Sequence, residues 1–258
     1  MKRSFREFAA KVPERGKIVA NIDDRNTMDA LAPLGRELFT FGLTDKADVY
    51  ARNIHRVGAN SEFDIYCHGK LFTSVTLHIP GIHNVKNALA ATAACICLGV
   101  RPNAVKYGLA GFNGAGRRFE FKGKFNGADV YDDYAHHPGE LKALLDAVEP
   151  LGYKRTILVF QPHTYSRTKA FLEDFADVLS LADVVVLADI YAAREKNTYG
   201  VSSRDILSKL RKRGTECYYF PSFEEIEKFL LKNCVNGDLL ITMGAGDIVN
   251  VGEHLLGK

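Results

Sequence analysis

The chain has 258 residues, of which 47% are hydrophobic and 25% charged, the ordinary mixture of a globular protein. This mixture excludes a disordered, collagen-like or coiled-coil chain, and the length fits one large or two modest domains. The formal net charge of +3 is too small to indicate a nucleic-acid partner. No apolar run is long enough to span a membrane, and the first residues lack the apolar core of a signal peptide, so we expect a cytoplasmic protein.

The first 113 residues are predicted to form an α/β arrangement with five strands. A short helix is expected at 5–11, strands at 17–22, 38–43, 47–57, 62–68 and 70–79, and helices at 83–100 and 102–109. Gly69 connects the last two strands as a hairpin would, and Pro80-Gly81 ends the strand pattern.

From residue 114 onward, strands and helices alternate. A hairpin with Asn126-Gly127 as its turn is predicted at 118–134, followed by strands at 156–160, 183–188, 216–220 and 238–242. Helices are predicted from Pro138, at 165–181, at 202–211, from Ser222 with a capping box to Glu225, and at 247–256. Such alternation predicts a mostly parallel sheet with right-handed crossovers, which binds ligands at the carboxyl ends of its strands.

Four polar loops follow these strands, at 131–138, 161–168, 189–196 and 243–247. Chain direction brings them to one edge of the sheet, and with them His136, His163, Arg167, Arg194 and the amides of Gly244 to Gly246. Arginine and helix N-terminal N–H groups suit phosphate or carboxylate ligands. Taken singly, each loop also has an ordinary explanation, as a helix cap, a solvated surface or a tight turn.

Two asparagines stand out in the first half. Asn84 and Asn87 are three residues apart, so a helix places both on one face, and their amides could pair with an adenine edge. The alternative is that Asn84 caps the helix and Asn87 is an ordinary surface residue.

Several motifs are missing from the sequence. None of its Gly-Lys pairs completes a Gly-x4-Gly-Lys-[Ser/Thr] phosphate loop, and neither Gly-Ala-Gly segment completes a dinucleotide fingerprint. The five cysteines are scattered, and no Cys or His set has the spacing of a metal site, so we expect neither a disulfide framework nor a metal held by this chain.

Four segments together resemble the Mur ligases, over nearly the whole chain and in the family's order. They are His83-Asn84-x-x-Asn87-Ala-Leu-Ala-Ala, Gly116-Arg-Arg-Phe-Glu120, Asp132-Asp-Tyr-Ala-His-His-Pro138 and Phe160-Gln-Pro-His-Thr-Tyr-Ser-Arg-Thr168. The last two most resemble the members that join L-alanine to UDP-N-acetylmuramate in peptidoglycan synthesis. The resemblance implies a reaction in which ATP, with Mg²⁺ bridging its phosphates, phosphorylates the substrate carboxylate, and the amine of L-alanine attacks the acyl phosphate.

The resemblance also implies residue roles. Asn84 and Asn87 would contact the adenine, Tyr134 would lie near it, Asp133 would bind the ribose hydroxyls, and Arg118 would reach the ATP phosphates. His136, His163 and Arg167 would face the carboxylates of L-alanine and the muramoyl group, and Gly244 to Gly246 would supply amides. Arg118, His136 and Arg167 are the expected catalytic residues.

The same resemblance implies what this chain lacks. Residues 1–113 correspond to the later part of the family's central ATPase domain, and 114–258 to a complete C-terminal Rossmann-like domain. The UDP-binding domain, the Gly-Thr-x-Gly-Lys-Thr phosphate loop and the metal-holding Glu and His have no counterpart here. We therefore expect no turnover by this chain alone, a need for a separate N-terminal half of the ligase, and poor solubility of 1–113 by itself.

Two other functions remain open from the sequence. One is a non-catalytic module that binds a nucleotide or a peptidoglycan precursor, which the missing phosphate loop favours. The other is a ligase that reattaches recycled tripeptide to UDP-N-acetylmuramate, which the loop from Gln161 to Arg167 argues against.

Overall fold

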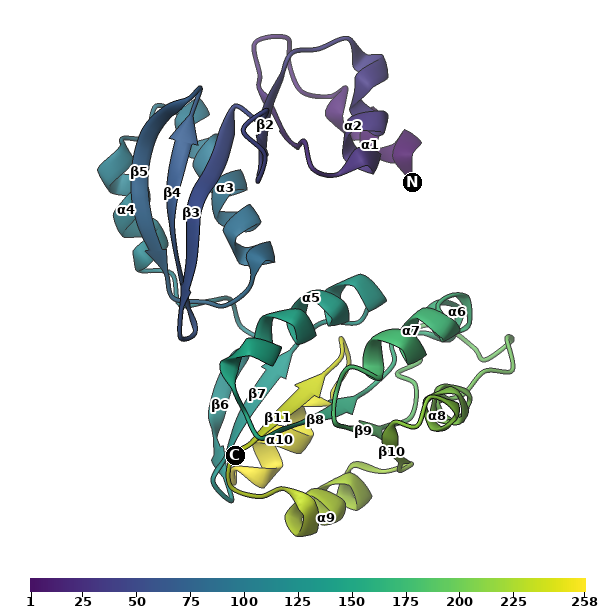
Figure 1. Cartoon of the computed structure of the whole chain (residues 1–258). Coiled ribbons are helices and arrows are strands. Elements are labelled where there is room, and N and C mark those ends of the chain that lie inside the picture. Colours follow the sequence, from purple (N-terminus) through teal and green to yellow (C-terminus); the bar gives the residue numbers. More distant parts are fainter. The chain divides into compact units, whose positions relative to one another are not determined.

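The computed structural model describes residues 1–258, which form two compact units, Met1–Asn113 and Gly114–Lys258. Both units are built from helices and a single β-sheet (Figure 1). No helix is both long and apolar enough to cross a bilayer.

The sheet of the first unit has five strands that lie side by side in chain order. They are β1 (Ile18–Asn21), β2 (Leu38–Gly42), β3 (Val49–Val57), β4 (Asn60–Cys67) and β5 (Lys70–Leu77). β1, β2 and β3 are parallel, whereas β3, β4 and β5 are antiparallel. All five predicted strands are confirmed, and His68 and Gly69 have the positive φ angles, 46° and 78°, that a tight hairpin turn requires.

The helices of the first unit are α1 (Lys2–Ala9), α2 (Arg25–Leu31), the 3₁₀ turn η1 (Ala32–Leu34), α3 (Ile82–Cys97) and α4 (Pro102–Ala110). α3 packs on the sheet because Val85, Leu89 and Ala93 recur on one side, and all three are fully buried. α2 is not expected from the sequence pattern. Its N-cap is Asp24, whose carboxylate accepts a hydrogen bond from Asn26 N–H.

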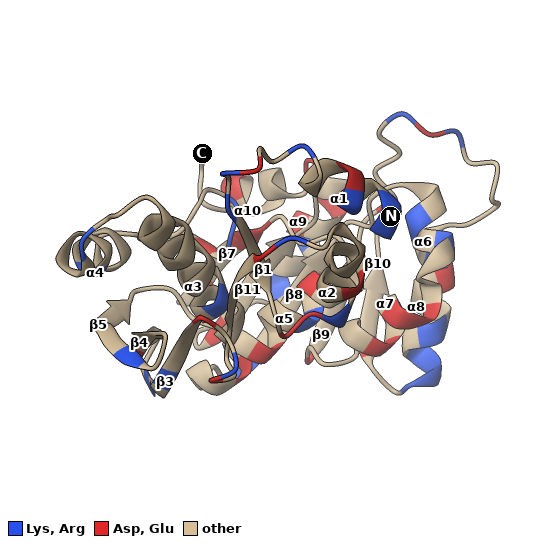
Figure 2. Ribbon diagram, turned by 90° about the horizontal axis from the view of Figure 1, so that it is seen from above, with Lys and Arg blue, Asp and Glu red and all other residues tan.

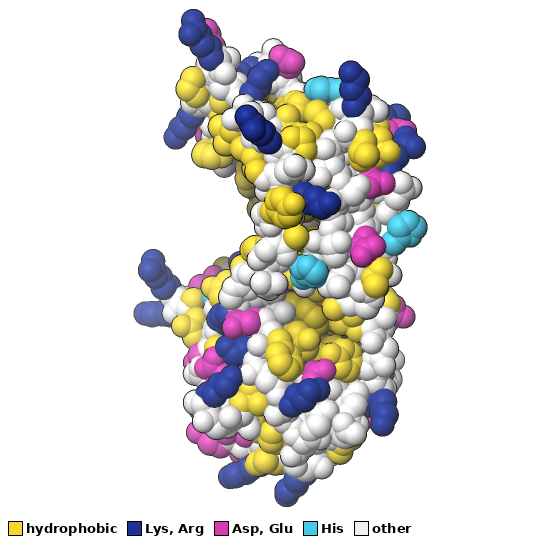
Figure 3. Space-filling model, turned by 90° about the vertical axis from the view of Figure 1, so that its left-hand side faces the viewer, with side chains coloured by type: hydrophobic (Ala, Val, Ile, Leu, Met, Phe, Trp, Pro, Cys, Tyr) yellow, Lys and Arg dark blue, Asp and Glu magenta, His cyan; other side chains and the backbone are white.

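One side of the first unit's sheet ends at β1, which pairs with β2 only. Several large apolar side chains of this unit are exposed, among them Phe8 (71%), Tyr107 (73%) and Leu98 (81%). Apolar side chains also gather between charged ones on the face of this unit seen in the upper part of Figure 3. An unpaired sheet edge and exposed apolar side chains are the features on which the expected poor solubility of 1–113 rests.

The second unit contains a six-stranded sheet in the order β10-β9-β8-β11-β7-β6, in which only β6 is antiparallel to its neighbour. Its strands are β6 (Glu120–Phe125), β7 (Ala128–Asp133), β8 (Arg155–Phe160), β9 (Val184–Leu187), β10 (Glu216–Tyr219) and β11 (Asp238–Met243). The predicted Rossmann-like, mostly parallel sheet is confirmed. So is the Asn126-Gly127 turn, with φ angles of 50° and 82°.

Helices cover both faces of this sheet (Figure 1). α5 (Pro138–Val148), α7 (Leu172–Leu179) and α8 (Ser203–Lys212) pack on one face, and α9 (Phe223–Asn233) and α10 (Val249–Leu255) on the other. The strands serve both cores by alternation, since Leu239 and Ile241 belong to the first core and Leu240 to the second. A short 3₁₀ turn, η2 (Glu149–Leu151), follows α5.

Two predictions about helices are wrong in detail. The helix expected at 165–181 is divided into α6 (Tyr165–Ala170) and α7, because Phe171 leaves the helical region at φ −115° and ψ 28°. At Ser222 only half of the predicted capping box forms, with the side chain accepting from Glu225 N–H. Complete boxes occur instead at His137 with Glu140 and at Ser202 with Asp205.

Candidate functional site

The candidate site lies at the carboxyl edge of the second unit's sheet, around β11. The helices after β7 and β8 pack on one face of the sheet, whereas α10, which follows β11, packs on the other. Chain connections therefore diverge on both sides of β11, the arrangement that opens ligand crevices in α/β sheets. Backbone hydrogen bonds join the loops there, from Gln161 N–H to Met243 O (3.0 Å) and from Gly244 N–H to Asp133 O (3.0 Å).

His136, His163 and Arg167 lie together at this edge. The rings of the two histidines have centroids 5.6 Å apart, and Arg167 Nη1 lies 3.1 Å from His163 Nδ1. Because a guanidinium can only donate, His163 Nδ1 accepts, and the proton of the neutral ring is on Nε2. Burial lowers the pKa of His163, and the charges of Arg167 and His136 lower it further.

The position of His136 is fixed by its own loop. Its Nδ1 lies 2.9 Å from the carbonyl oxygen of Tyr134, which can only accept, so Nδ1 donates. The backbone N–H of His136 donates to Glu140 Oε2 at 3.0 Å, and Glu140 is the third residue of α5. The start of α5 thus positions the first histidine, with its Nε2 left for a ligand.

The lowered pKa of His163 predicts a pH dependence of stability. The unfolded chain binds the proton more tightly than the folded one, so stability is complete above the unfolded pKa of about 6.5 and is lost as pH falls through the folded pKa. We expect the melting temperature to fall less between pH 7 and pH 5 in His163→Gln than in the unsubstituted chain. The melting temperatures are measured by calorimetry at each pH. An equal fall of the melting temperature in the two proteins would contradict this prediction.

The two adjacent arginines have different surroundings. Arg117 is turned inward: its Nε donates to the buried Asp132 at 2.8 Å, and its Nη groups donate to the carbonyl oxygens of Gly246 (3.0 Å) and Gly244 (2.8 Å). Arg118 is exposed, and its guanidinium forms no hydrogen bond within the chain, although it lies over the Tyr134 ring at 5.8 Å. Arg118 therefore retains its donors for an anionic ligand, whereas Arg117 holds the loop after β11.

Asp132 and Asp133, the last two residues of β7, are both buried. Asp133 accepts from Phe119 N–H (2.7 Å) and Ala135 N–H (2.8 Å), so its carboxylate orders the turn at the end of β7. Burial raises the pKa of Asp133 and also that of Asp132. Both carboxylate oxygens of Asp133 already accept a backbone N–H, so a ribose hydroxyl could donate only to the lone pairs that remain on them.

The glycines after β11 are needed for close packing. A Cβ on Gly244, at φ 150°, would lie 2.7 Å from Gln161 O, and one on Gly246 would lie 2.2 Å from Gln161 Oε1. The expectation that the Gly244 amide faces a ligand is corrected, because this N–H donates to Asp133 O. The amide of Gly246 remains a candidate donor.

Sequence reasoning did not single out Tyr191 and Glu195. The Tyr191 ring stacks on His163 with centroids 5.6 Å apart and an interplanar angle of 16°. Glu195 accepts from Ser166 N–H at 2.9 Å, and the neighbouring Arg194 is exposed. Glu195 and Ser166 are 29 positions apart in the chain, so no local pattern could have paired them.

In the first unit, Asn84 and Asn87 lie on one side of α3, as predicted. Asn84 Nδ2 donates to Pro80 O at 2.7 Å, and Asn87 Nδ2 lies 3.3 Å from Asn84 Oδ1. The alternative that Asn84 caps the helix is wrong, since the N-cap is Gly81. Asn87 is exposed and Asn84 half-buried.

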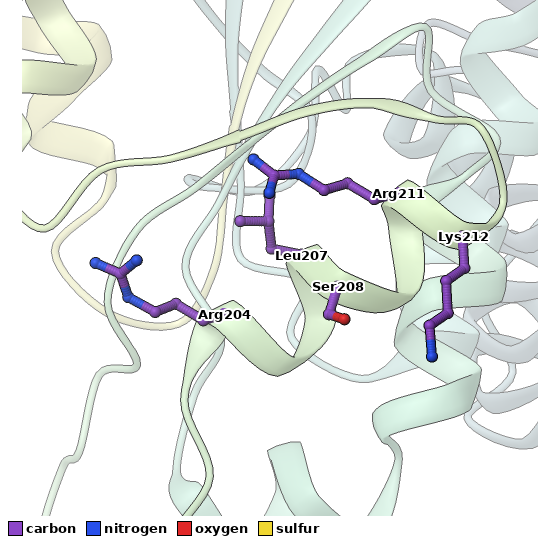
Figure 4. Close-up of a pocket in the computed structure, with 5 residues that line it drawn as sticks. All are labelled: Arg204, Leu207, Ser208, Arg211 and Lys212. Atoms are coloured by element: carbon purple, nitrogen blue, oxygen red, sulfur yellow. The ribbon is translucent and has the colours of Figure 1, made fainter.

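Lys and Arg recur along α8 (Figure 2), where a shallow open groove of about 480 Å³ lies over the helix. Figure 4 shows that Lys212 points in a different direction from Arg204 and Arg211, so the three charges do not converge on one ligand. No group of three or more His, Cys, Asp or Glu side chains is arranged to hold a metal ion.

This Rossmann-like sheet thus carries histidine, arginine and glycine-rich loops at one edge, and these groups suit anionic ligands. Family comparison names the class: residues 117–246 match the Mur ligase, glutamate ligase domain, and residues 1–95 match the Mur ligase middle domain. The chain belongs to the Mur ligase family.

Among curated relatives, a UDP-N-acetylmuramate–L-alanine ligase from Agathobacter rectalis is 53% identical over 259 residues, covering all of this chain and 56% of the relative. The chain thus spans about half the length of the curated relatives it matches. A solved UDP-N-acetylmuramate–alanine ligase from Thermotoga maritima has a TM-score of 0.79 at 27% identity, over 99% of this chain and 54% of that one. A Thermotoga maritima MurF ligase in complex with ADP shares the fold alone, with a TM-score of 0.67 at 18% identity over 93% of this chain and 52% of that one.

Proposed function

We propose that the chain is the ATP- and amino-acid-handling part of a ligase that joins L-alanine to the carboxylate of UDP-N-acetylmuramate. The observation that carries this proposal is the meeting of His136, His163 and Arg167 at the carboxyl edge of the sheet, because these donors suit substrate carboxylates. The relatives named for the same reaction support it. In this proposal, 1–113 is part of the central ATPase domain and 114–258 is the C-terminal domain.

Each of the two units offers polar groups that suit ATP. Arg118 is exposed and unpaired, as a residue that neutralises phosphate charge should be, and the Asn84 and Asn87 amides offer the donor and acceptor atoms that an adenine edge needs. Bound ATP with Mg²⁺ supplies the phosphoryl group that activates the carboxylate. The chain's own residues bind and orient: Asp133 and Tyr134 the nucleoside, and His136, His163 and Arg167 the two carboxylates.

A reconstitution experiment tests this function. The chain is mixed with the part of the Agathobacter rectalis relative that it does not match, and phosphate release is followed with Mg-ATP, UDP-N-acetylmuramate and L-alanine. We expect turnover in the mixture and none with either piece alone. Turnover with tripeptide but not with L-alanine would favour the recycling ligase, and binding without turnover would favour the non-catalytic module.

In the reconstituted enzyme, Arg167→Ala should raise the KM for L-alanine tens-fold or more, as the loss of a charged contact does. Lys169→Ala, on the same helix, is the matched control and should leave this KM unchanged. An unchanged KM in Arg167→Ala would remove Arg167 from the substrate site.

A further inference from the structure

The connection between β9 and α8, residues 188–202, is attached to the loop after β8. The N–H of Tyr191 donates to Pro162 O at 2.8 Å, and the N–H of Thr164 donates to Tyr191 O at 2.9 Å. The Tyr191 ring also stacks on His163. Backbone and side chain of the connection therefore both contact the segment that carries His163.

Glu195 extends this attachment to the start of α6. One of its carboxylate oxygens accepts from Ser166 N–H at 2.9 Å and the other from Ser166 Oγ at 2.5 Å. These bonds lower the pKa of Glu195, so the carboxylate is ionised at neutral pH. The residue after Ser166 is Arg167, whose guanidinium contacts His163.

The segment between His163 and Ser166 is strained. Thr164 has φ 65° and ψ 143°, a strained conformation that a β-branched residue rarely adopts. Such a conformation persists only where the surroundings enforce it. Here the backbone bond from Thr164 to Tyr191 and the Glu195 bonds to Ser166 enforce it from both sides.

We propose that Glu195 is a positioning residue of the ligase site, which fixes the first turn of α6 and thereby holds Arg167 against His163. His163 Nε2 and the guanidinium N–H groups not bonded to His163 are then left together for a substrate carboxylate. Only this last step rests on the proposed function; the positioning itself does not.

The ionisation of His163, followed by NMR in the whole chain, tests the positioning. The groups that face this ring are Arg167, His136 and Glu195, with Tyr191 stacked on it. The charge of Glu195 itself raises the pKa of His163, whereas that of Arg167 lowers it. Removing the Glu195 charge therefore has a direct effect, which is to lower the pKa of His163. It has an indirect effect in the opposite direction if Arg167 moves away, because the ring then loses a neighbouring positive charge.

We expect Glu195→Gln to raise the pKa of His163, because the loss of the Arg167 contact outweighs the direct effect. In an Arg167→Met background the same substitution should lower the pKa, since only the direct effect remains.

A lowered or unchanged pKa in the unsubstituted background would overturn the proposal, and so would a rise in both backgrounds, which would indicate local unfolding. Glu149→Gln, at an exposed carboxylate of η2, is the control and should change neither value. The signal is assigned by its loss in His163→Gln.

The consequence for substrate is measured in the reconstituted enzyme. Glu195→Gln should raise the KM for L-alanine about tenfold and leave the KM for ATP unchanged, and Glu195→Asp should be intermediate. Equal changes in both KM values would contradict selective positioning. If reconstitution gives no turnover even without substitutions, the proposed function fails, and the NMR titration alone decides the role of Glu195.

Discussion

Replacing Arg117 by Met should lower the free energy of unfolding of the second unit by about 3–5 kcal/mol, the usual cost of removing one partner of a buried ion pair. Asp132 is completely buried and would lose its cation, and the carbonyl oxygens of Gly244 and Gly246 would each lose a donor. Thr242 Oγ1, at 2.8 Å, would remain the side-chain donor to Asp132. Urea denaturation followed by circular dichroism measures the change.

Arg118→Met is the matched control for this substitution. The Arg118 side chain is exposed and forms no hydrogen bond, so its loss should change stability by less than about 0.5 kcal/mol, while raising the KM for ATP in the reconstituted enzyme. The double variant Arg117→Met/Asp132→Asn should recover part of the lost stability, because it removes the unpaired carboxylate. Equal destabilisation by the two arginine substitutions would refute the division of roles between them.

Gly244→Ala should destabilise the second unit by about 3 kcal/mol, combining backbone strain with overpacking. Its φ of 150° is unfavourable for any side chain, and the new Cβ would lie 2.7 Å from the backbone oxygen of Gln161, which cannot rotate away. The loop after β11 would then separate from the loop after β8. Thermal melts followed by calorimetry measure the loss.

Gly139→Ala provides the comparison for Gly244. Gly139 lies in the first turn of α5, where the nearest atom to an added Cβ is His137 Nδ1 at an ordinary 3.6 Å. This substitution should be neutral or slightly stabilising, since alanine has the higher helix propensity. If both variants melt at the same temperature, the close packing at Gly244 does not contribute to stability.

Much of the second unit could be predicted from local patterns. The spacing of Leu141, Leu144, Leu145 and Val148 identifies a helix face, and all four are buried. The Val-rich run at 183–188 identifies a strand buried on both faces, and each residue of β9 is buried. The edge at which the predicted loops meet followed from chain direction alone.

Other features depend on contacts that no local pattern contains. The apolar period continues through Phe171, so the sequence gives no sign of the helix break there. Arg117 and Arg118 are the same residue type side by side, and only the φ of 57° at Arg117 and the buried Asp132 on β7 determine which one turns inward. α2 is short and has only its Asp24 cap as a local signal.

The place of β11 in the sheet has a consequence for how the second unit is made. β11 follows every other strand in the chain, yet it lies between β7 and β8, which do not pair with each other. During synthesis from the N-terminus, the β6–β7 hairpin and the β8–β9–β10 sheet therefore remain two separate pieces with open inner edges until residue 243 has left the ribosome. The edge that carries the candidate site is assembled by the same late event, because the loops after β7 and β8 are both bonded to the segment at the end of β11.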